Sequence, residues 1–548
     1  MTTVAEAVGR TLARLGVGHA FGVVGSGNFY LTNALRRGGV PFTAARHEGG
    51  AATMADAYAR MSGHLAVLTT HQGCGLTNAV TGLTEAAKSR TPLLVLAADT
   101  QASAVRSNFR IDQDALARSI GAVAERVHSP ASAVADTVRA YRTAVHERRT
   151  VVLSVPLDVQ AAEAPESHGA DLRLPQPQPV RPSAAAVSAL VELLATAERP
   201  VFVAGRGARH AKTELRALAH GCGALLATSA VAHGLFAGDP FNLGISGGFS
   251  SPLSAELIRD ADLIVAWGCT LNMWTMRHGQ LIGPETQVVQ VDVEDAALGC
   301  NRPVTLGVHG DCAQTAADVL NLWRTHHRDP QIRYRTAQVA GAIAERSRWR
   351  DTPTPDLSTG ERIDPRVLSR ALDDLLPTER TVSIDSGNFM GYPSTYLSVP
   401  DELGFCFTQA FQSIGLGLAT AIGAALAQPN RLAVLGSGDG GFLMAISELE
   451  TAVRLKVPLV CIVYNDAAYG AEVHHFVEDD HTTVRFPETD LAALARGFGA
   501  GGVTVRTLGD LGAVRDWLAV PQDRPLVIDA KIVSDGGAWW LHEAFKGH

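Results

Sequence analysis

Two polar residues near the C-terminal end of the chain each close a stretch of apolar residues. Asp439 closes "LAVLGSGD" (432–439), and Asn465 closes "LVCIVYN" (459–465). A carboxylate and a carboxamide both offer hard oxygen atoms, and Mg²⁺ takes few such protein ligands while water and phosphate complete its octahedron. A helix is expected over 442–455, and the start of a helix presents free N–H groups and a positive dipole end to an anion. The pattern therefore indicates a site for a metal-bridged diphosphate.

The same residues also have a plain structural interpretation. "GDGG" (438–441) is a common strand-to-helix turn, and Asn465 could simply cap a turn. The apolar helix and the second apolar strand between Asp439 and Asn465 favour the binding site over this alternative.

The elements that must position these residues are strands of parallel sheets. Short β-branched runs alternate with helical patterns along the chain, at 65–70, 92–99, 150–156, 200–205, 262–268, 287–293, 381–385, 432–439, 459–465 and 526–532. Continuous apolar strands interleaved with helices predict parallel sheets covered on both faces. Ligands of such sheets bind beyond the carboxyl ends of the strands, so Asp439 and Asn465 should share one rim.

Two stretches interrupt this alternation. Residues 164–184 are proline-rich and predict an extended linker, and residues 325–362 are charged and end in "DTPTPDLSTGER". A chain of 548 residues is also too long for a single core. We therefore predict an α/β protein of three doubly wound parallel-sheet domains, at 1–165, 185–325 and 360–548.

The composition excludes several other classes of protein. With 46% hydrophobic residues and a formal charge of -8, the chain is typical of a soluble globular enzyme, and no basic stripe suits nucleic acid. The seven cysteines are scattered without a C-x-x-C pair, which predicts buried thiols in a reducing compartment. No apolar run approaches the ~20 residues that span a bilayer, so no membrane partner and a cytoplasmic location are expected.

A second candidate acid lies in the N-terminal domain. Glu48 falls in the first turn of the helix expected over "RHEGGAATMADAYAR" (46–60), whose small residues allow close packing. A glutamate held in an apolar pocket can handle a proton in general acid–base catalysis. The alternative is an ordinary first-turn glutamate that the helix dipole favours.

Together these segments resemble the thiamine-diphosphate-dependent enzyme family, over nearly the whole chain. Its signature is G-D-G followed about twenty-five residues later by Asn, and its glutamate stands in an R-H-E-x-x-A context, as Glu48 does. The resemblance implies an N-terminal domain that binds the aminopyrimidine, a central domain, and a C-terminal domain that binds the diphosphate. Glu48 is then the carboxyl group that lets the aminopyrimidine remove the thiazolium C2 proton.

The resemblance also implies the cofactor contacts. Asp439, Asn465 and the carbonyl of Ala467 match the Mg²⁺ ligands. Ile414 matches the bulky apolar residue that separates the two rings of the cofactor, although core packing would also explain it. The diphosphate contacts correspond to Gly387, Asn388, Gly438, Gly440 and Gly441. Members of the family often carry Ser where Gly441 stands, which leaves only backbone donors there.

Further residues distinguish members of the family from one another. Benzoylformate-decarboxylase-like members carry a serine and a histidine where Ser26 and His71 fall, and a histidine can orient a carboxylate and move protons. His71 could instead only bind loop backbone. Gln113 follows an acid, as a glutamine does in benzaldehyde lyase, and is therefore a candidate for the catalytic pocket. Arg110 stands where acetolactate synthase has a glutamine. A second benzoylformate-decarboxylase histidine is replaced by Thr275.

Other polar and aromatic residues are candidates for the substrate channel. Glu472, His474 and His475 follow the metal loop directly, and Trp539 and Trp540 could cap the site. The run "AGRGARHA" (204–211) follows a strand but lacks the third glycine and the acid of a dinucleotide fingerprint. FAD in the central domain is therefore possible but not favoured.

The resemblance implies decarboxylation of a small 2-oxo acid. An acetolactate-synthase-like enzyme then joins the remaining fragment to a second carbonyl compound, and the overall similarity favours this carboligation. A benzoylformate-decarboxylase-like enzyme instead releases an aldehyde, which His71 favours. A catalytically idle regulatory homologue would not need Glu48, Asp439 and Asn465 together. The family also implies a homodimer or homotetramer in which Glu48 reaches across to the diphosphate held by the other chain.

Overall fold

The computed structural model describes residues 2–165, 174–175, 177–327 and 329–536. Within these residues the strands form three six-stranded sheets in which all neighbouring strands are parallel. This confirms the predicted α/β class of three doubly wound sheets. Trp539 and Trp540 lie outside the described residues. No helix in the described ranges is both long enough and apolar enough to cross a membrane.

The N-terminal sheet has the strand order β2-β1-β3-β4-β6-β5. Its strands are β1 (His19–Gly22), β2 (Phe42–Ala44), β3 (Ala66–Thr70), β4 (Leu93–Asp99), β5 (Val123–Arg126) and β6 (Thr150–Pro156). Its helices are α1 (Val4–Arg14), α2 (Phe29–Arg37), α3 (Glu48–Ser62), α4 (Cys74–Asn78), α5 (Val80–Lys88), α6 (Gln113–Ser119), α7 (Ala133–His146) and α8 (Leu157–Ala161). Strands β3, β4 and β6 are buried along their whole length, which explains their largely apolar sequences.

The central sheet has the order β12-β11-β10-β7-β8-β9. It comprises β7 (Pro200–Ala204), β8 (Leu225–Thr228), β9 (Asn242–Ile245), β10 (Leu263–Trp267), β11 (Gln287–Asp292) and β12 (Leu306–His309). The helices here are α9 (Ala184–Thr196), α10 (Lys212–Cys222), α11 (Pro252–Arg259), α12 (Cys312–His326) and α13 (Ala337–Arg346). Ile343 of α13 packs in the same apolar cluster as β10, so the chain beyond residue 325 still contributes to the central core.

The C-terminal sheet has the order β14-β13-β15-β16-β18-β17. It comprises β13 (Arg380–Ile384), β14 (Phe405–Phe407), β15 (Leu432–Gly438), β16 (Leu459–Asn465), β17 (Gly501–Val505) and β18 (Leu526–Lys531). Its helices are α14 (Pro365–Leu375), α15 (Gly391–Tyr396), α16 (Gly417–Ala427), α17 (Asp439–Met444), α18 (Glu448–Arg454), α19 (Gly470–His475), α20 (Leu491–Gly497) and α21 (Gly512–Leu518).

The expectation of one helix over 442–455 is wrong. Helix α17 starts at Asp439 itself and ends at Met444, and α18 starts only at Glu448. The buried Glu448 carboxylate accepts hydrogen bonds from the distant backbone N–H groups of Arg46 and His47. The break thus lies where this long-range contact joins two domains, and no local sequence signal reports such a contact.

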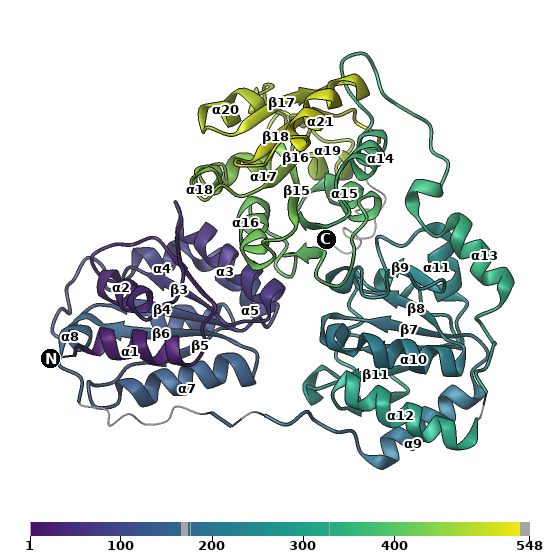
Figure 1. The fold of residues 1–548 in the computed structure, drawn as a ribbon, viewed down its shortest axis with the longest axis horizontal. Helices are drawn as coiled ribbons and strands as arrows, with labels where there is room; N and C mark the ends of the chain where they lie inside the picture. The colour runs from purple at the N-terminus through teal and green to yellow at the C-terminus, as the bar shows by residue number, and fades with distance from the viewer. Residues whose placement is uncertain (1, 166–173, 176, 328, 537–548) are drawn as a thin grey trace.

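Helices α3 and α16 join the N-terminal and C-terminal domains (Figure 1). Both helices are rich in Ala and Gly, which lets their backbones approach closely. A Cβ atom added at Gly423 would lie 2.3 Å from the carbonyl oxygen of Met54, so only glycine fits there. In Figure 1 the central domain lies opposite the N-terminal domain, and the upper edge of the central domain meets the C-terminal domain.

The cysteines agree only in part with the prediction of buried thiols. All seven are free, but Cys74 and Cys300 are exposed while the other five are buried.

Candidate active site

Asp439 and Asn465 lie next to each other at the carboxyl ends of two central strands. Strands β15 and β16 are paired neighbours, with Gly438 in register with Tyr464, one residue before each polar side chain. Both side chains are buried. Ala467 follows in the left-handed region, with φ of 57°, which turns the chain sharply just beyond β16. The structure thus brings the three predicted metal ligands to one rim of the sheet.

Two carboxyl groups, those of Asp439 and Asp466, lie close together at the rim. Burial and the nearby Asp466 carboxylate raise the pKa of Asp439 to about 7. Burial also raises the pKa of Asp466 to about 6. Two neighbouring buried carboxylates disfavour each other's ionised form, and a bound divalent cation reverses that preference. The donor set therefore fits a hard cation such as Mg²⁺.

Hydrogen bonds fix the orientation of the Asn465 carboxamide. Its Nδ2 donates to Asp529 Oδ1 (2.8 Å), and its Oδ1 accepts from the Ala467 N–H (3.1 Å). Asp529 in turn pairs with Lys531 at 3.1 Å. Because Asp529 accepts from the amide nitrogen, the Asn465 oxygen must face the turn at Ala467. The sequence placed Asp529 in a strand but gave no sign of this role.

A cavity of about 940 Å³ opens beside this rim, and residues of all three domains line it, Lys88 and Ser89 of the N-terminal domain among them. Asp439, Asp466 and Ile414 line it. Asn465 and Ala467 do not, although their chain neighbours Tyr464, Asp466 and Ala468 do. The wall also contains all five predicted diphosphate contacts, Gly387, Asn388, Gly438, Gly440 and Gly441. A wall of glycine backbone next to a buried acid fits a diphosphate bridged to a metal.

Asp385, which the sequence did not single out, ties this wall together. Its carboxylate accepts hydrogen bonds from the N–H groups of Ser386 (2.8 Å) and Gly415 (3.0 Å) and from the Ser437 hydroxyl (3.2 Å). Burial raises the pKa of Asp385 to about 6. The side chain thereby fixes the loop that carries Ile414 against the ends of β13 and β15.

Glu48 is the first residue of α3 and is 9% exposed. Asn78 Nδ2 donates to Glu48 Oε2 at 3.0 Å, and the N–H of Gly49 donates to His47 Nδ1. Glu48 does not line the cavity beside Asp439, nor do the other three predicted catalytic residues, Ser26, His71 and Gln113. Within one chain, the structure therefore keeps these two groups of predicted site residues apart.

His71 lies at the centre of the N-terminal group. Its Nε2 is 3.4 Å from Ser26 Oγ, and its Nδ1 is 3.1 Å from the Gln72 carbonyl oxygen. A Cβ atom added at Gly75 would lie 3.2 Å from His71 Cβ and 3.4 Å from Glu48 Oε1, so both side chains border the same glycine. Glu48, His71 and Ser26 thus form one partly exposed patch.

Gln113 supports this patch from inside the domain. The side chain is 1% exposed, its Oε1 accepts from the Gly73 N–H (3.0 Å) and its Nε2 donates to Ser154 Oγ (3.4 Å). Gly73 has φ of 63°, where glycine is favoured. Gln113 therefore holds the loop between His71 and Cys74 and offers no exposed face in this chain.

Glu448 positions Glu48 from the C-terminal domain. Glu448 Oε1 accepts from the N–H groups of Arg46 (3.1 Å) and His47 (2.9 Å), directly before Glu48 in the chain. Thr451 Oγ1 also donates to the Glu448 carboxylate, at 2.7 Å. Burial raises the pKa of Glu448. The turn that starts α3 is thus held by a residue some four hundred positions away.

We expect Glu448→Ala to lower the free energy of unfolding by about 1–3 kcal/mol and to lower turnover roughly tenfold. Two partly buried backbone N–H groups lose their acceptor, and Glu48 loses its fixed position. Glu450→Ala is the matched control, since the half-exposed Glu450 pairs with the Arg46 side chain and should contribute less than about 1 kcal/mol. Chemical denaturation and steady-state kinetics measure both. Equal effects of the two substitutions on kcat would contradict a positioning role for Glu448.

The substrate-channel candidates separate in the structure. Glu472 and Thr275 line the cavity, whereas His474 and His475 do not.

In the central domain, a Cβ atom added at Gly205 would lie 2.2 Å from the Gly268 carbonyl oxygen. Close packing between the loops after β7 and β10 thus explains this glycine, and Gly205 and Gly207 also line the cavity.

Comparison with known proteins defines the family. The N-terminal, central and C-terminal domain models of thiamine pyrophosphate enzymes match residues 2–119, 187–319 and 385–530. A probable 2-ketoarginine decarboxylase of Pseudomonas aeruginosa is 31% identical, covering 85% of this chain and 83% of the relative. The chain therefore belongs to the thiamine-diphosphate-dependent enzyme family, as the resemblance predicted, and is an enzyme of this cofactor.

Other similar proteins span several activities. Sulfoacetaldehyde acetyltransferase of Alcaligenes xylosoxydans xylosoxydans is 28% identical, covering 93% of this chain and 89% of the relative. The acetolactate synthase large subunit of Parasynechococcus marenigrum is 27% identical, covering 91% of this chain and 83% of the relative. A solved thiamine diphosphate-dependent 4-hydroxybenzoylformate decarboxylase of Rhodococcus jostii shares the fold, with a TM-score of 0.82 and 23% identity over 98% of this chain and 100% of that chain.

Proposed function

We propose that this enzyme decarboxylates a small 2-oxo acid and joins the remaining fragment to a second carbonyl compound. The observation that carries the proposal is the cavity in which the Asp439 rim, the glycine wall and Ile414 meet. Relatives with acetyltransferase, acetolactate synthase and decarboxylase names support chemistry on oxo compounds.

The residues of the rim fit the cofactor and its metal. Asp439, Asn465 and the Ala467 carbonyl would hold Mg²⁺, and the backbone of Gly387, Gly440 and the other wall glycines would hold the diphosphate. When bound, thiamine diphosphate supplies a carbon nucleophile for the ketone carbon and accepts the electrons left by CO₂. The protein supplies the binding, the proton at Glu48 and the exclusion of water.

The two separated groups of residues are brought together by a second copy of the chain. Glu48 and His71 lie at a partly exposed patch beside Phe109, which is 44% exposed. The rim of the other group carries Met444, which is 62% exposed and lies beside Gly415. Contact with another chain would bury both of these apolar side chains. A homodimer, or a tetramer of two such dimers, would place Glu48 of one chain at the Asp439 rim of another.

A screen of 2-oxo acids tests the proposed reaction. With thiamine diphosphate and Mg²⁺ present, we expect CO₂ release from at least one 2-oxo acid, and mass spectrometry should show a ligated hydroxyketone when an acceptor carbonyl compound is added. Release of the free aldehyde alone would identify the decarboxylase instead. No cofactor-dependent CO₂ release from any acid would contradict both reactions and favour an idle homologue.

Simple decarboxylation is the second candidate, and the contact between His71 and Ser26 favours it. A histidine at this place can deliver the proton that completes an aldehyde. We expect His71→Ala to reduce aldehyde release by about 10²-fold or more while thiamine diphosphate affinity stays within about twofold. The exposed His64 provides the control substitution. If product ratio and rate are the same in His71→Ala and wild type, His71 serves only the loop structure.

A further inference from the structure

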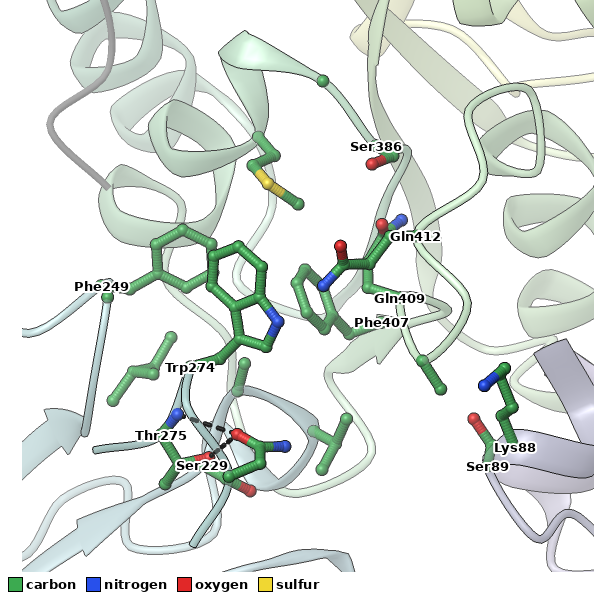
Figure 2. Close-up of a pocket in the computed structure, with 18 of the residues that line it drawn as sticks. Lys88, Ser89, Ser229, Phe249, Trp274, Thr275, Ser386, Phe407, Gln409 and Gln412 are labelled. Carbon is green, nitrogen blue, oxygen red and sulfur yellow. Dashed lines mark hydrogen bonds between the residues drawn. The ribbon is translucent and has the colours of Figure 1, made fainter. Parts of the chain in front are cut away.

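Three aromatic side chains from distant parts of the chain meet in the cavity. Phe249 and Trp274 come from loops of the central domain and Phe407 from the end of β14, and all three line the cavity and are half-buried. The rings of Phe249 and Phe407 lie edge to face, with centroids 6.0 Å apart and an interplanar angle of 83°. Figure 2 shows all three labelled side chains in the same part of the cavity.

The backbone of Trp274 is rigidly held. Its carbonyl oxygen accepts from the Gly248 N–H at 3.0 Å, and a Cβ atom added at the preceding Gly247 would lie 1.9 Å from that oxygen. Arg277 Nε donates back to the Gly247 carbonyl at 2.9 Å. Thr275, the next residue, donates through both its N–H and its hydroxyl to Asn272 Oδ1 (Figure 2).

The loop that presents Trp274 is also strained. Leu271, Arg277 and His278 have φ of 51°, 45° and 53°, in the left-handed region that non-glycine residues rarely adopt. Strained backbone of this kind persists where surrounding contacts impose it, and it concentrates at ligand sites. The loop therefore supports a fixed aromatic wall.

This wall shares its cavity with the candidate cofactor site. Ile414, Gln412 and Asp439 line the same space as Trp274. In Figure 2 Gln412 and Ser386, from the C-terminal domain, lie across the cavity from Trp274. A substrate bound beside Ile414 would therefore share one cavity with the three rings.

We infer that Trp274 is a specificity-determining residue and that, with Phe249 and Phe407, it selects 2-oxo acids that carry an aryl substituent. This inference rests on the proposed function and names its substrate class. Aromatic rings gain from offset or edge-to-face contacts beyond simple burial, whereas the methyl group of pyruvate is too small to make them. The fixed backbone of Trp274 adds to this selectivity, because the loop need not become ordered on binding.

Calorimetric titration of the full-length Glu48→Gln protein, loaded with thiamine diphosphate and Mg²⁺, tests the inference with benzoylformate and pyruvate as probes. We expect benzoylformate to bind at least tenfold more tightly than pyruvate. Trp274→Ala should weaken the binding of benzoylformate roughly tenfold but the binding of pyruvate less than about twofold. Trp274→Phe should retain most of the preference for benzoylformate, because it restores an aromatic face.

The outcomes separate the inference from the proposed function. Failure of the protein to bind thiamine diphosphate would overturn both. Normal cofactor binding together with equal affinity for the two acids, or an equal loss for both in Trp274→Ala, would overturn the inference alone. Copurification of a flavin that absorbs visible light and is lost in Trp274→Ala would likewise overturn it, since a cofactor ring would then occupy the aromatic wall.

Discussion

A Glu48→Gln variant should bind thiamine diphosphate and Mg²⁺ nearly as tightly as the wild type but lose turnover by roughly 10²–10⁴-fold. The amide has the same size as the carboxylate and keeps an oxygen that can accept the hydrogen bond from Asn78 Nδ2. What it lacks is the ability to take up and hold a proton. Calorimetric titration of the cofactor and CO₂ release under identical conditions measure the two properties separately.

The exposed Glu147 of the same domain is a suitable control position, because Glu147→Gln should change neither property. Turnover of Glu48→Gln close to that of the wild type would show that Glu48 has no role in proton transfer. A parallel loss of cofactor binding and turnover would instead indicate that Glu48 is part of the binding surface.

Asp439→Asn is expected to weaken Mg²⁺-dependent binding of thiamine diphosphate by at least about 100-fold. The substitution preserves shape but removes the charge that a divalent cation needs, and the Asn465 carboxamide and the Ala467 carbonyl cannot replace it. Titration of the cofactor at several Mg²⁺ concentrations should show that the wild type depends on the metal and that the variant barely responds to it.

Asp466→Asn is the matched control for this prediction. Asp466 is a half-buried acid on the same cavity wall but does not match a metal ligand of the family. We expect its replacement to weaken the binding of thiamine diphosphate less than about tenfold. If Asp466→Asn is as damaging as Asp439→Asn, the metal is held by a different set of oxygens.

The sequence predicts the long buried strands and the rim they form. The interiors of β4, β6, β15, β16 and β18 are largely apolar, and this pattern also identified Asp439 and Asn465 as strand-end residues. Edge strands such as β2 and β14 have three residues each, which is too short for an apolar pattern to identify them as strands. The fold class could thus be read from the core strands alone.

The residues that sequence reasoning missed act through tertiary contacts. Glu448 and Asp385 are buried acids whose partners are backbone N–H groups of distant loops, and no local pattern reports such pairs. The burial of Gln113 behind Gly73 was hidden for the same reason. Likewise the aromatic wall joins Trp274 to Phe407 only through the meeting of two domains.

Co-expression of Glu48→Gln and Asp439→Asn chains tests most directly whether each site joins the Asp439 rim of one chain to Glu48 of another. Each variant alone should be nearly inactive, but every mixed dimer would contain one site with both native residues. Random pairing should therefore restore turnover to roughly one quarter of the wild-type value. Mixed dimers that form, as shown by native mass spectrometry of differently tagged chains, yet stay as inactive as the separate variants would contradict the shared site.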